Sequence, residues 1–188
     1  MQRDDHDPSG DPSGDAGELV RTIPDPGFAD DAGAGDPRVA RARADHAAGA
    51  VSSGAVLSLL QDARLLVPVV AVLGEVEVDA QGLTHDKSSD MAAVLVQAAD
   101  GSKGLLAFTS TETMARWDPQ ARPVPVTATT AATAAIQDGA EALLVDLAGP
   151  VTYVVEGADL ERLAAGWRLV GLTGPGEGGY GWIGPSAE

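Results

Sequence analysis

The stretches Met91-Ala92-Ala93-Val94-Leu95-Val96 and Leu105-Leu106-Ala107-Phe108 decide the fold class of this chain. Each is an apolar run of strand length, and the polar segment Ala99-Asp100-Gly101-Ser102 lies between them. Asp-Gly suits the positive φ angles of a tight turn. We therefore predict an antiparallel β-hairpin over these residues.

A second hairpin is predicted from the apolar runs at 142–146 and 151–155, which flank the short turn at 147–150. Two helices are predicted between the hairpins. Thr109 and Glu112 have the spacing of an S/T-x-x-E capping box, so the first helix begins there, carries Met114 and Trp117 inward, and ends before Pro119. The second runs over 128–138 with an alanine stripe on one face and a glycine cap at 139.

The segment before the first hairpin predicts two helices and a strand. Asp36-Pro37 is typical of a helix N-cap followed by proline in the first turn, and this helix extends to Ala48. The second helix begins near Ser53, and the apolar run at 65–73 forms a strand that is covered on both faces. Because proline has no N–H to donate, we expect a bulge or one-sided pairing at Pro68.

Alternating prolines in Arg122-Pro123-Val124-Pro125-Val126 restrict this run to an edge strand or a polyproline-like strand. A last short helix is predicted around residues 160–164. Hairpins require antiparallel pairs, whereas strand–helix–strand passages favour parallel ones. The prediction is one α/β (α+β) domain with a mixed five- to six-stranded sheet, two hairpins and helices packed on the sheet.

The domain is predicted to span residues 36–170. Residues 1–35 have too few apolar side chains to offset the entropy of ordering and are predicted to be a disordered acidic leader. Residues 171–188 are glycine-rich and are predicted to be a C-terminal segment, either a loose tail or a flap over the domain.

Charge and composition exclude several classes of function. The formal net charge is −16, and such an acidic chain would repel phosphate backbones, so nucleic-acid binding is disfavoured. The absence of cysteine excludes disulfides and thiolate chemistry. No apolar run approaches the about 20 residues of a membrane span, and the first residues do not resemble a signal peptide. We therefore expect a cytoplasmic protein that does not bind membranes.

Seven short strings, in order along the chain, resemble the N-terminal domain of the SseB family, which is named for enhanced serine sensitivity. The resemblance covers roughly residues 30–170 and implies a bacterial α/β domain with no defining reaction. The strings are Arg64-Leu65-Leu66-Val67-Pro68-Val69, Asp86-Lys87-Ser88-Ser89-Asp90-Met91-Ala92, Asp100-Gly101, Phe108-Thr109-Ser110, Trp117-Asp118-Pro119, Ala121-Arg122-Pro123-Val124-Pro125-Val126 and Leu144-Val145-Asp146-Leu147-Ala148-Gly149-Pro150.

The polar loop before the first hairpin is one candidate binding site. Lys87 would bind an anion while Ser88 and Ser89 donate hydrogen bonds, because loop residues beside a buried strand often line sites. In the structural alternative, Asp90 fixes the turn of the loop through its backbone, and Lys87 pairs with Asp86 or Asp90. His85 lies close enough in sequence to act as a base for Ser88, but no G-x-S-x-G nucleophile elbow is present.

A second candidate is the corner formed by Trp117, Asp118 and Arg122. Arg122 would accept an anionic partner or pair with Asp118. The structural alternative is that Trp117 anchors its helix to the sheet. No P-loop, dinucleotide-binding or EF-hand motif is present in the sequence, so no cofactor or metal is expected.

Two functions remain open from the sequence. The first is a non-enzymatic protein-interaction or regulatory module with a protein partner of unknown identity. The second is a domain that binds a small anion or amino acid, or a weak enzyme, whose site combines the loop at 87–90 with the corner at 117–122. The oligomeric state is not predicted.

Overall fold

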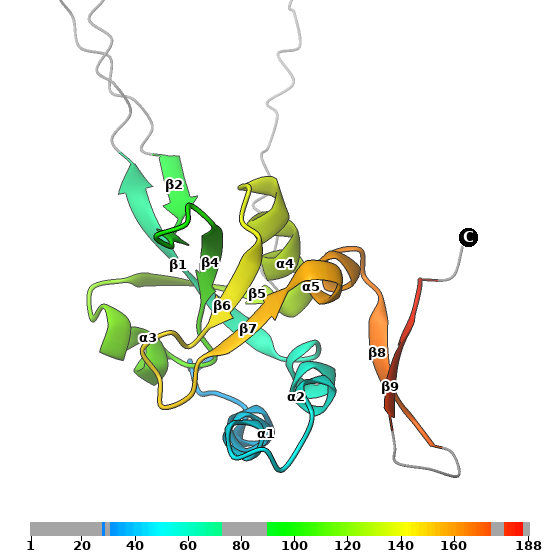
Figure 1. The fold of residues 1–188 in the computed structure, drawn as a ribbon. Helices are drawn as coiled ribbons and strands as arrows, with labels where there is room; N and C mark the ends of the chain where they lie inside the picture. Colours follow the sequence, from blue (N-terminus) through cyan, green and yellow to red (C-terminus); the bar gives the residue numbers. More distant parts are fainter. Residues whose placement is uncertain (1–27, 29–30, 73–89, 174–178, 186–188) are drawn as a thin grey trace, which may run out of the picture.

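The computed structural model describes residue 28 and residues 31–72, 90–173 and 179–185 (Figure 1). These residues form five helices and nine strands, and the fold class is α+β, as predicted. The polar loop at 73–89 lies outside the described residues, and so do residues 1–27 and 29–30 of the predicted leader.

Strand β1 (Arg64–Val72) is the centre of a three-stranded sheet with the order β2-β1-β5. Its neighbours β2 (Asp90–Ala93) and β5 (Arg122–Thr127) both pair with it antiparallel. A four-stranded sheet has the order β3-β4-β6-β7 and consists of β3 (Leu95–Gln97), β4 (Lys103–Ala107), β6 (Ala142–Val145) and β7 (Tyr153–Glu156). In this sheet β4 and β6 are parallel, and the other pairs are antiparallel.

The single mixed sheet of the prediction is thus divided in two, and Val94 is the point of division. Val94 donates its backbone N–H to Pro68 O (3.2 Å) and accepts from Leu106 N (3.1 Å), so it joins β1 to β4 between β2 and β3. Leu66 and Phe108 also exchange backbone hydrogen bonds of 2.8 Å. The predicted strand at 91–96 therefore bends and serves both sheets. Both predicted hairpins, β3–β4 and β6–β7, are present.

The prolines occupy positions where a missing N–H costs no ladder hydrogen bond. Leu66 directs its backbone N–H to Phe108, away from β5. Every second residue of a strand directs its backbone groups to the same side, so the backbone of Pro68 also points away from β5. Pro123 opposes Pro68 and Pro125 opposes Leu66, so both prolines of β5 present their nitrogens to its outer side. The predictions of an edge strand at 122–126 and of one-sided pairing at Pro68 are confirmed.

Helices α1 (Pro37–Ala47) and α2 (Ser53–Leu60) begin within one residue of their predicted starts. Asp36 caps α1 by accepting from Arg38 N at 2.8 Å. Helix α3 (Thr111–Trp117) differs from the prediction, because its capping box joins Ser110 and Thr113. Thr109 and Glu112 do not form it, since the hydroxyl of Thr109 bonds to Asp146 (2.6 Å).

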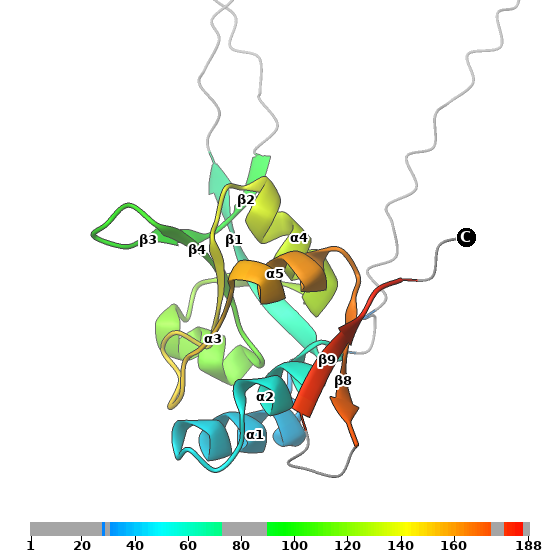
Figure 2. The ribbon, with the colours of Figure 1, turned by 45° about the vertical axis from the view of Figure 1, so that its right-hand side comes forward.

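Helices α4 (Ala128–Gln137) and α5 (Gly157–Ala164) cover one face of the four-stranded sheet together with α2, whereas α3 packs against the other face (Figures 1 and 2). The predicted alanine stripe of α4 is completely buried, which places this helix close to the sheet. Leu105 and Leu106 belong to the two opposite cores, as alternation along β4 requires.

Strands β8 (Arg168–Leu172) and β9 (Gly179–Ile183) pair antiparallel as a third hairpin, which the sequence did not predict. The predicted boundary at 171 falls inside β8. The hairpin rests on α2: Leu169 is buried, and a Cβ on Gly54 would lie 2.6 Å from the Tyr180 ring. Of the two alternatives for this segment, the described part corresponds to a flap that packs on the domain.

The described end of the predicted leader lies on the domain. Asp31 pairs with Arg64 (2.7 Å), and Gly33 O accepts from Thr111 N (2.8 Å) at the start of α3. The prediction that residues 1–35 form a disordered leader is therefore wrong for residues 31–35.

Candidate functional site

Of the first sequence candidate, the loop at 87–90, the structure describes only Asp90. Lys87 and Ser88 lie outside the described residues. Asp90 is the first residue of β2, and its backbone pairs with Val72. Its side-chain role stays a prediction.

The second candidate, the corner at Trp117 and Arg122, is present but its residues belong to different surroundings. The Trp117 ring lies 5.6 Å from the Phe108 ring and packs on the smaller core with Met114. This contact favours the structural alternative, a tryptophan that anchors α3. Arg122 is exposed at the start of β5, where it pairs with Val69 of β1.

A buried polar cluster that the sequence analysis did not predict lies at the end of β6. Asp146 directly follows this strand, is fully buried and has a φ of 54°. Aspartate is among the few residues that adopt this left-handed conformation without a large penalty. The turn that follows is tight, because Gly149 N donates to Asp146 O (2.8 Å) and a Cβ on Gly149 would lie 3.1 Å from Asp146.

The Asp146 carboxylate accepts four hydrogen bonds. Oδ1 accepts from Thr109 N (2.8 Å) and from the hydroxyl of Thr113 (2.7 Å). Oδ2 accepts from the hydroxyl of Thr109 (2.6 Å) and from Nη1 of Arg43. These four bonds fill the lone pairs that an ionised carboxylate offers. Asp146 is therefore an acceptor that holds four donors in place, and it has no free lone pair with which to act as a base.

Arg43 brings the opposite charge to the cluster from α1. Its side chain is buried, Nη1 donates to Asp146, and Nη2 donates to the carbonyl of Val151 in the turn before β7. Nε is buried and has no hydrogen-bond partner among the described residues. The cluster thus ties α1, the end of β4, α3 and the β6–β7 turn together.

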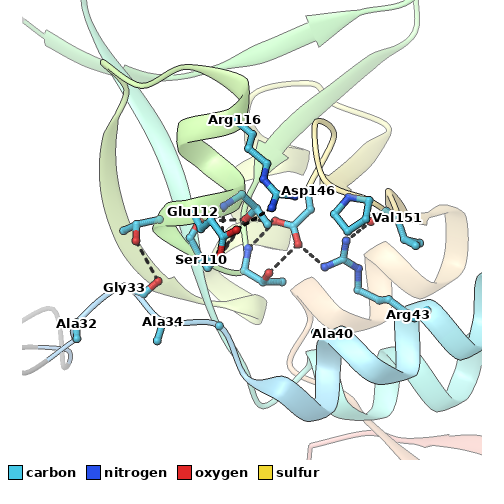
Figure 3. A pocket seen from close by; sticks show the side chains of 16 residues that line it. Ala32, Gly33, Ala34, Ala40, Arg43, Ser110, Glu112, Arg116, Asp146 and Val151 are labelled. Carbon is cyan, nitrogen blue, oxygen red and sulfur yellow. Dashed lines mark hydrogen bonds and ion pairs between the residues drawn. The ribbon is translucent and has the colours of Figure 1, made fainter.

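A cavity of about 580 Å³ adjoins this cluster (Figure 3). Arg43, Asp146 and Ser110 line it, and Figure 3 shows Arg116 and Glu112 on its opposite side from Ala40. Arg116 and Glu112 form an exposed ion pair of 2.7 Å one turn apart on α3. Most of the other lining residues are small: Ala32, Gly33, Ala34, Gly35, Ala40 and Ala44.

Two signals in the sequence pointed toward this cluster. Thr109 and Asp146 both lie in strings that carry the family resemblance, Phe108-Thr109-Ser110 and the run at 144–150. Local sequence rules predict Thr109 as a helix cap and Asp146 as the end of a strand, and neither role indicates a contact between the two. Arg43 had no distinguishing signal, because it is one of several arginines on a helix with weak amphipathic character.

Two further properties bear on the site. Among the described residues, no group of three or more histidine, aspartate and glutamate side chains is placed to hold a metal ion. No helix in the described part of the chain has the length and apolar character to cross a membrane.

Comparison with known proteins gives one match. The family model described as the SseB protein N-terminal domain matches residues 39–162, about two thirds of the chain. No curated protein and no solved structure matches. The match includes Arg43, Thr109, Thr113 and Asp146, whereas the β8–β9 hairpin lies outside it. The chain belongs to the SseB protein N-terminal domain family.

Proposed function

We propose that this protein is a non-enzymatic interaction module that binds a basic protein partner through the outer face of the β8–β9 hairpin. The observation that carries this proposal is a concentration of exposed apolar side chains. Leu172 is 53% exposed and Ile183 is 59% exposed, and the partly exposed Val170 lies between them on the same face of the hairpin. Contiguous exposed apolar patches on soluble proteins commonly mark interaction sites.

The hairpin has two apolar faces but only one is covered. Leu169 and Trp182 pair across it and face the main core, where the Trp182 indole N–H donates to Asp159 (3.0 Å). Side chains alternate along a strand, so Leu172 and Ile183 face the other way. In Figures 1 and 2 this hairpin stands at the periphery, beside α2 and apart from the two larger sheets.

Charge supports a basic partner. The chain has a net charge of −16, which disfavours acidic partners and nucleic acids. Protein interfaces combine an apolar centre with a polar rim, and complementary charge accelerates association. The partner expected is a protein with an apolar contact surface and a basic rim.

Strand addition at β5 is a less favourable mode of binding. The outer side of β5 presents the nitrogens of Pro123 and Pro125, which cannot donate hydrogen bonds to an added strand. β9 contains no proline in Gly179–Ile183. The hairpin is therefore the better-suited contact surface of the two.

The test compares tagged full-length variants in pull-downs from the native host. Leu172→Thr with Ile183→Thr removes the apolar face while keeping good strand formers. Val154→Thr is the matched control, because Val154 is an exposed strand residue on β7. The expected result is a stoichiometric basic protein that the control retains and the double variant loses, with recovery that falls as NaCl rises. Equal capture by all three chains, or no partner at low salt, would contradict the proposal.

Deletion of residues 1–27 provides a second measurement. This segment contains seven acidic and two basic residues, a net charge of −5. If it contributes only to electrostatic attraction, its removal lowers the association rate of the identified partner and leaves the dissociation rate unchanged.

A further inference from the structure

The hydrogen bonds of the Arg43–Asp146 pair are unevenly satisfied. All four acceptor positions of Asp146 are filled. A guanidinium has five N–H donors, and the described residues provide acceptors for two of those of Arg43, at Asp146 and Val151. The buried Nε is among the donors without an acceptor.

A buried donor without an acceptor is costly, and native proteins usually satisfy such groups with protein atoms, water or a ligand. Asp146, the acid that pairs with Arg43, has no acceptor position left for a further donor. The cavity that Arg43 lines is adjacent, and a ligand in it would bring further acceptor atoms.

The chain keeps this cavity open with small residues. Gly33 has a φ of 78°, and a Cβ there would lie 2.3 Å from the Cγ2 atom of Thr111, so no larger residue fits without a shift. Ala40 and Ala44 provide the wall on α1. The volume of about 580 Å³ is in the range typical of small-molecule sites.

A second cation is available on the rim. The side chains of Arg116 and Glu112 are 51% and 76% exposed, so solvent weakens their ion pair and the pair opens readily. Arg116 can therefore turn to an anionic group in the cavity at little cost. Arginine is well suited to carboxylates, because its planar donors match the two carboxylate oxygens.

We propose that this cavity binds a small carboxylate ligand, which accepts hydrogen bonds from Arg43 at the floor and from Arg116 at the rim. The two arginines and the two acids, Asp146 and Glu112, make the site electrically neutral before the ligand binds. The ligand is small because the overall charge of −16 opposes the entry of larger polyanions. None of the lining residues belongs to the β8–β9 hairpin, so this proposal is independent of the protein-partner proposal.

The test is calorimetric titration of the full-length protein with acetate, succinate and inorganic phosphate at fixed ionic strength. The variant is Arg116→Gln, which removes the rim cation without touching the buried pair. Arg41→Gln is the matched control, because Arg41 is an exposed arginine in an i,i+4 ion pair on α1 and does not line the cavity. Far-ultraviolet circular dichroism checks that both variants are folded.

We expect saturable binding of a carboxylate, with a dissociation constant at least about tenfold weaker in Arg116→Gln and unchanged in Arg41→Gln. Tenfold corresponds to the loss of one charge-assisted hydrogen bond. Absence of saturable carboxylate binding, or equal weakening by both variants, overturns the proposal. Tighter binding of phosphate than of either carboxylate overturns the assignment of the ligand class.

Discussion

Arg43→Met provides the most direct test of the Asp146 cluster. The substitution keeps a helix-forming side chain of similar length on α1 but removes the charge. Asp146 would remain fully buried with three of its four hydrogen bonds and no counterion. Breaking a buried ion pair from one side costs about 3–5 kcal/mol, a large share of the about 5–15 kcal/mol that stabilises a typical domain.

A double-mutant cycle separates this effect from lost packing. Asp146→Asn removes the opposite charge, and asparagine also tolerates the positive φ of 54°. The amide nitrogen of the asparagine would replace one carboxylate oxygen and would face a donor group of either Thr109 or Arg43. This single substitution should therefore also cost about 3 kcal/mol. In the double variant no unpaired charge remains. We expect its loss of stability to be smaller than the sum of the two by at least about 2 kcal/mol.

Urea unfolding, followed by circular dichroism and by the fluorescence of Trp117 and the other tryptophans, measures the four stabilities. Equal m-values across the four proteins would show that the substitutions change the free energy of unfolding without changing the surface area exposed on unfolding. Additivity to within about 0.5 kcal/mol would refute the view that Arg43 and Asp146 stabilise the fold as one unit. If Arg43→Met is too unstable to measure, Thr113→Val removes one donor at 2.7 Å and should cost about 1–3 kcal/mol.

Three further perturbations test other parts of the fold. Gly33→Ala should cost more than Gly49→Ala in urea unfolding: both glycines have positive φ, which costs about 1–2 kcal/mol for alanine, but only the first would place a Cβ within 2.3 Å of α3. Asp36→Ala should cost about 1 kcal/mol at neutral pH through loss of the helix cap. The hydrogen bond from the Arg38 side chain lowers the pKa of Asp36. The stability that Asp36 contributes is therefore present above pH about 4 and is lost as pH falls through the lowered pKa. A difference in stability between wild type and Asp36→Ala that persists at low pH would contradict this. Burial raises the pKa of the Tyr153 hydroxyl, so the folded state keeps this proton at pH values where the unfolded chain has released it. The free energy of unfolding therefore falls as pH rises above about 10. Tyr153→Phe should therefore lose less stability than the wild type between pH 9 and 11 in thermal unfolding.

The elements that the sequence predicted well depend on signals within a few residues. Asp36-Pro37 specifies a helix start through one side-chain bond, to Arg38 N at 2.8 Å. The alternating prolines of β5 exclude a central strand because each lacks a donor. In both cases the local chemistry permits one structure, and no distant residue changes the outcome.

The β8–β9 hairpin was missed because its signal is not local. Its glycines weaken strand propensity, and no continuous apolar run marks β9. Its position is set by contacts with α2, more than 100 residues earlier in the chain: Gln61 both accepts from Leu169 N (2.8 Å) and donates to Leu169 O (2.9 Å). The glycine at 54 makes room for Tyr180, and neither residue indicates the other in the sequence.

Thr109 shows how a distant residue overrides a correct local rule. Its spacing from Glu112 fits a capping box, but its hydroxyl cannot donate to Asp146 and remain oriented as the cap of α3. Ser110 takes over as the cap, and Thr113 then serves two purposes, because it completes the capping box and donates to Asp146. The start of α3 is therefore set by a carboxylate 37 residues away in sequence. Asp146 bonds both to Arg43 and to Thr113 of α3, the helix that carries Arg116, so one carboxylate positions both cations to which the proposed ligand would bind.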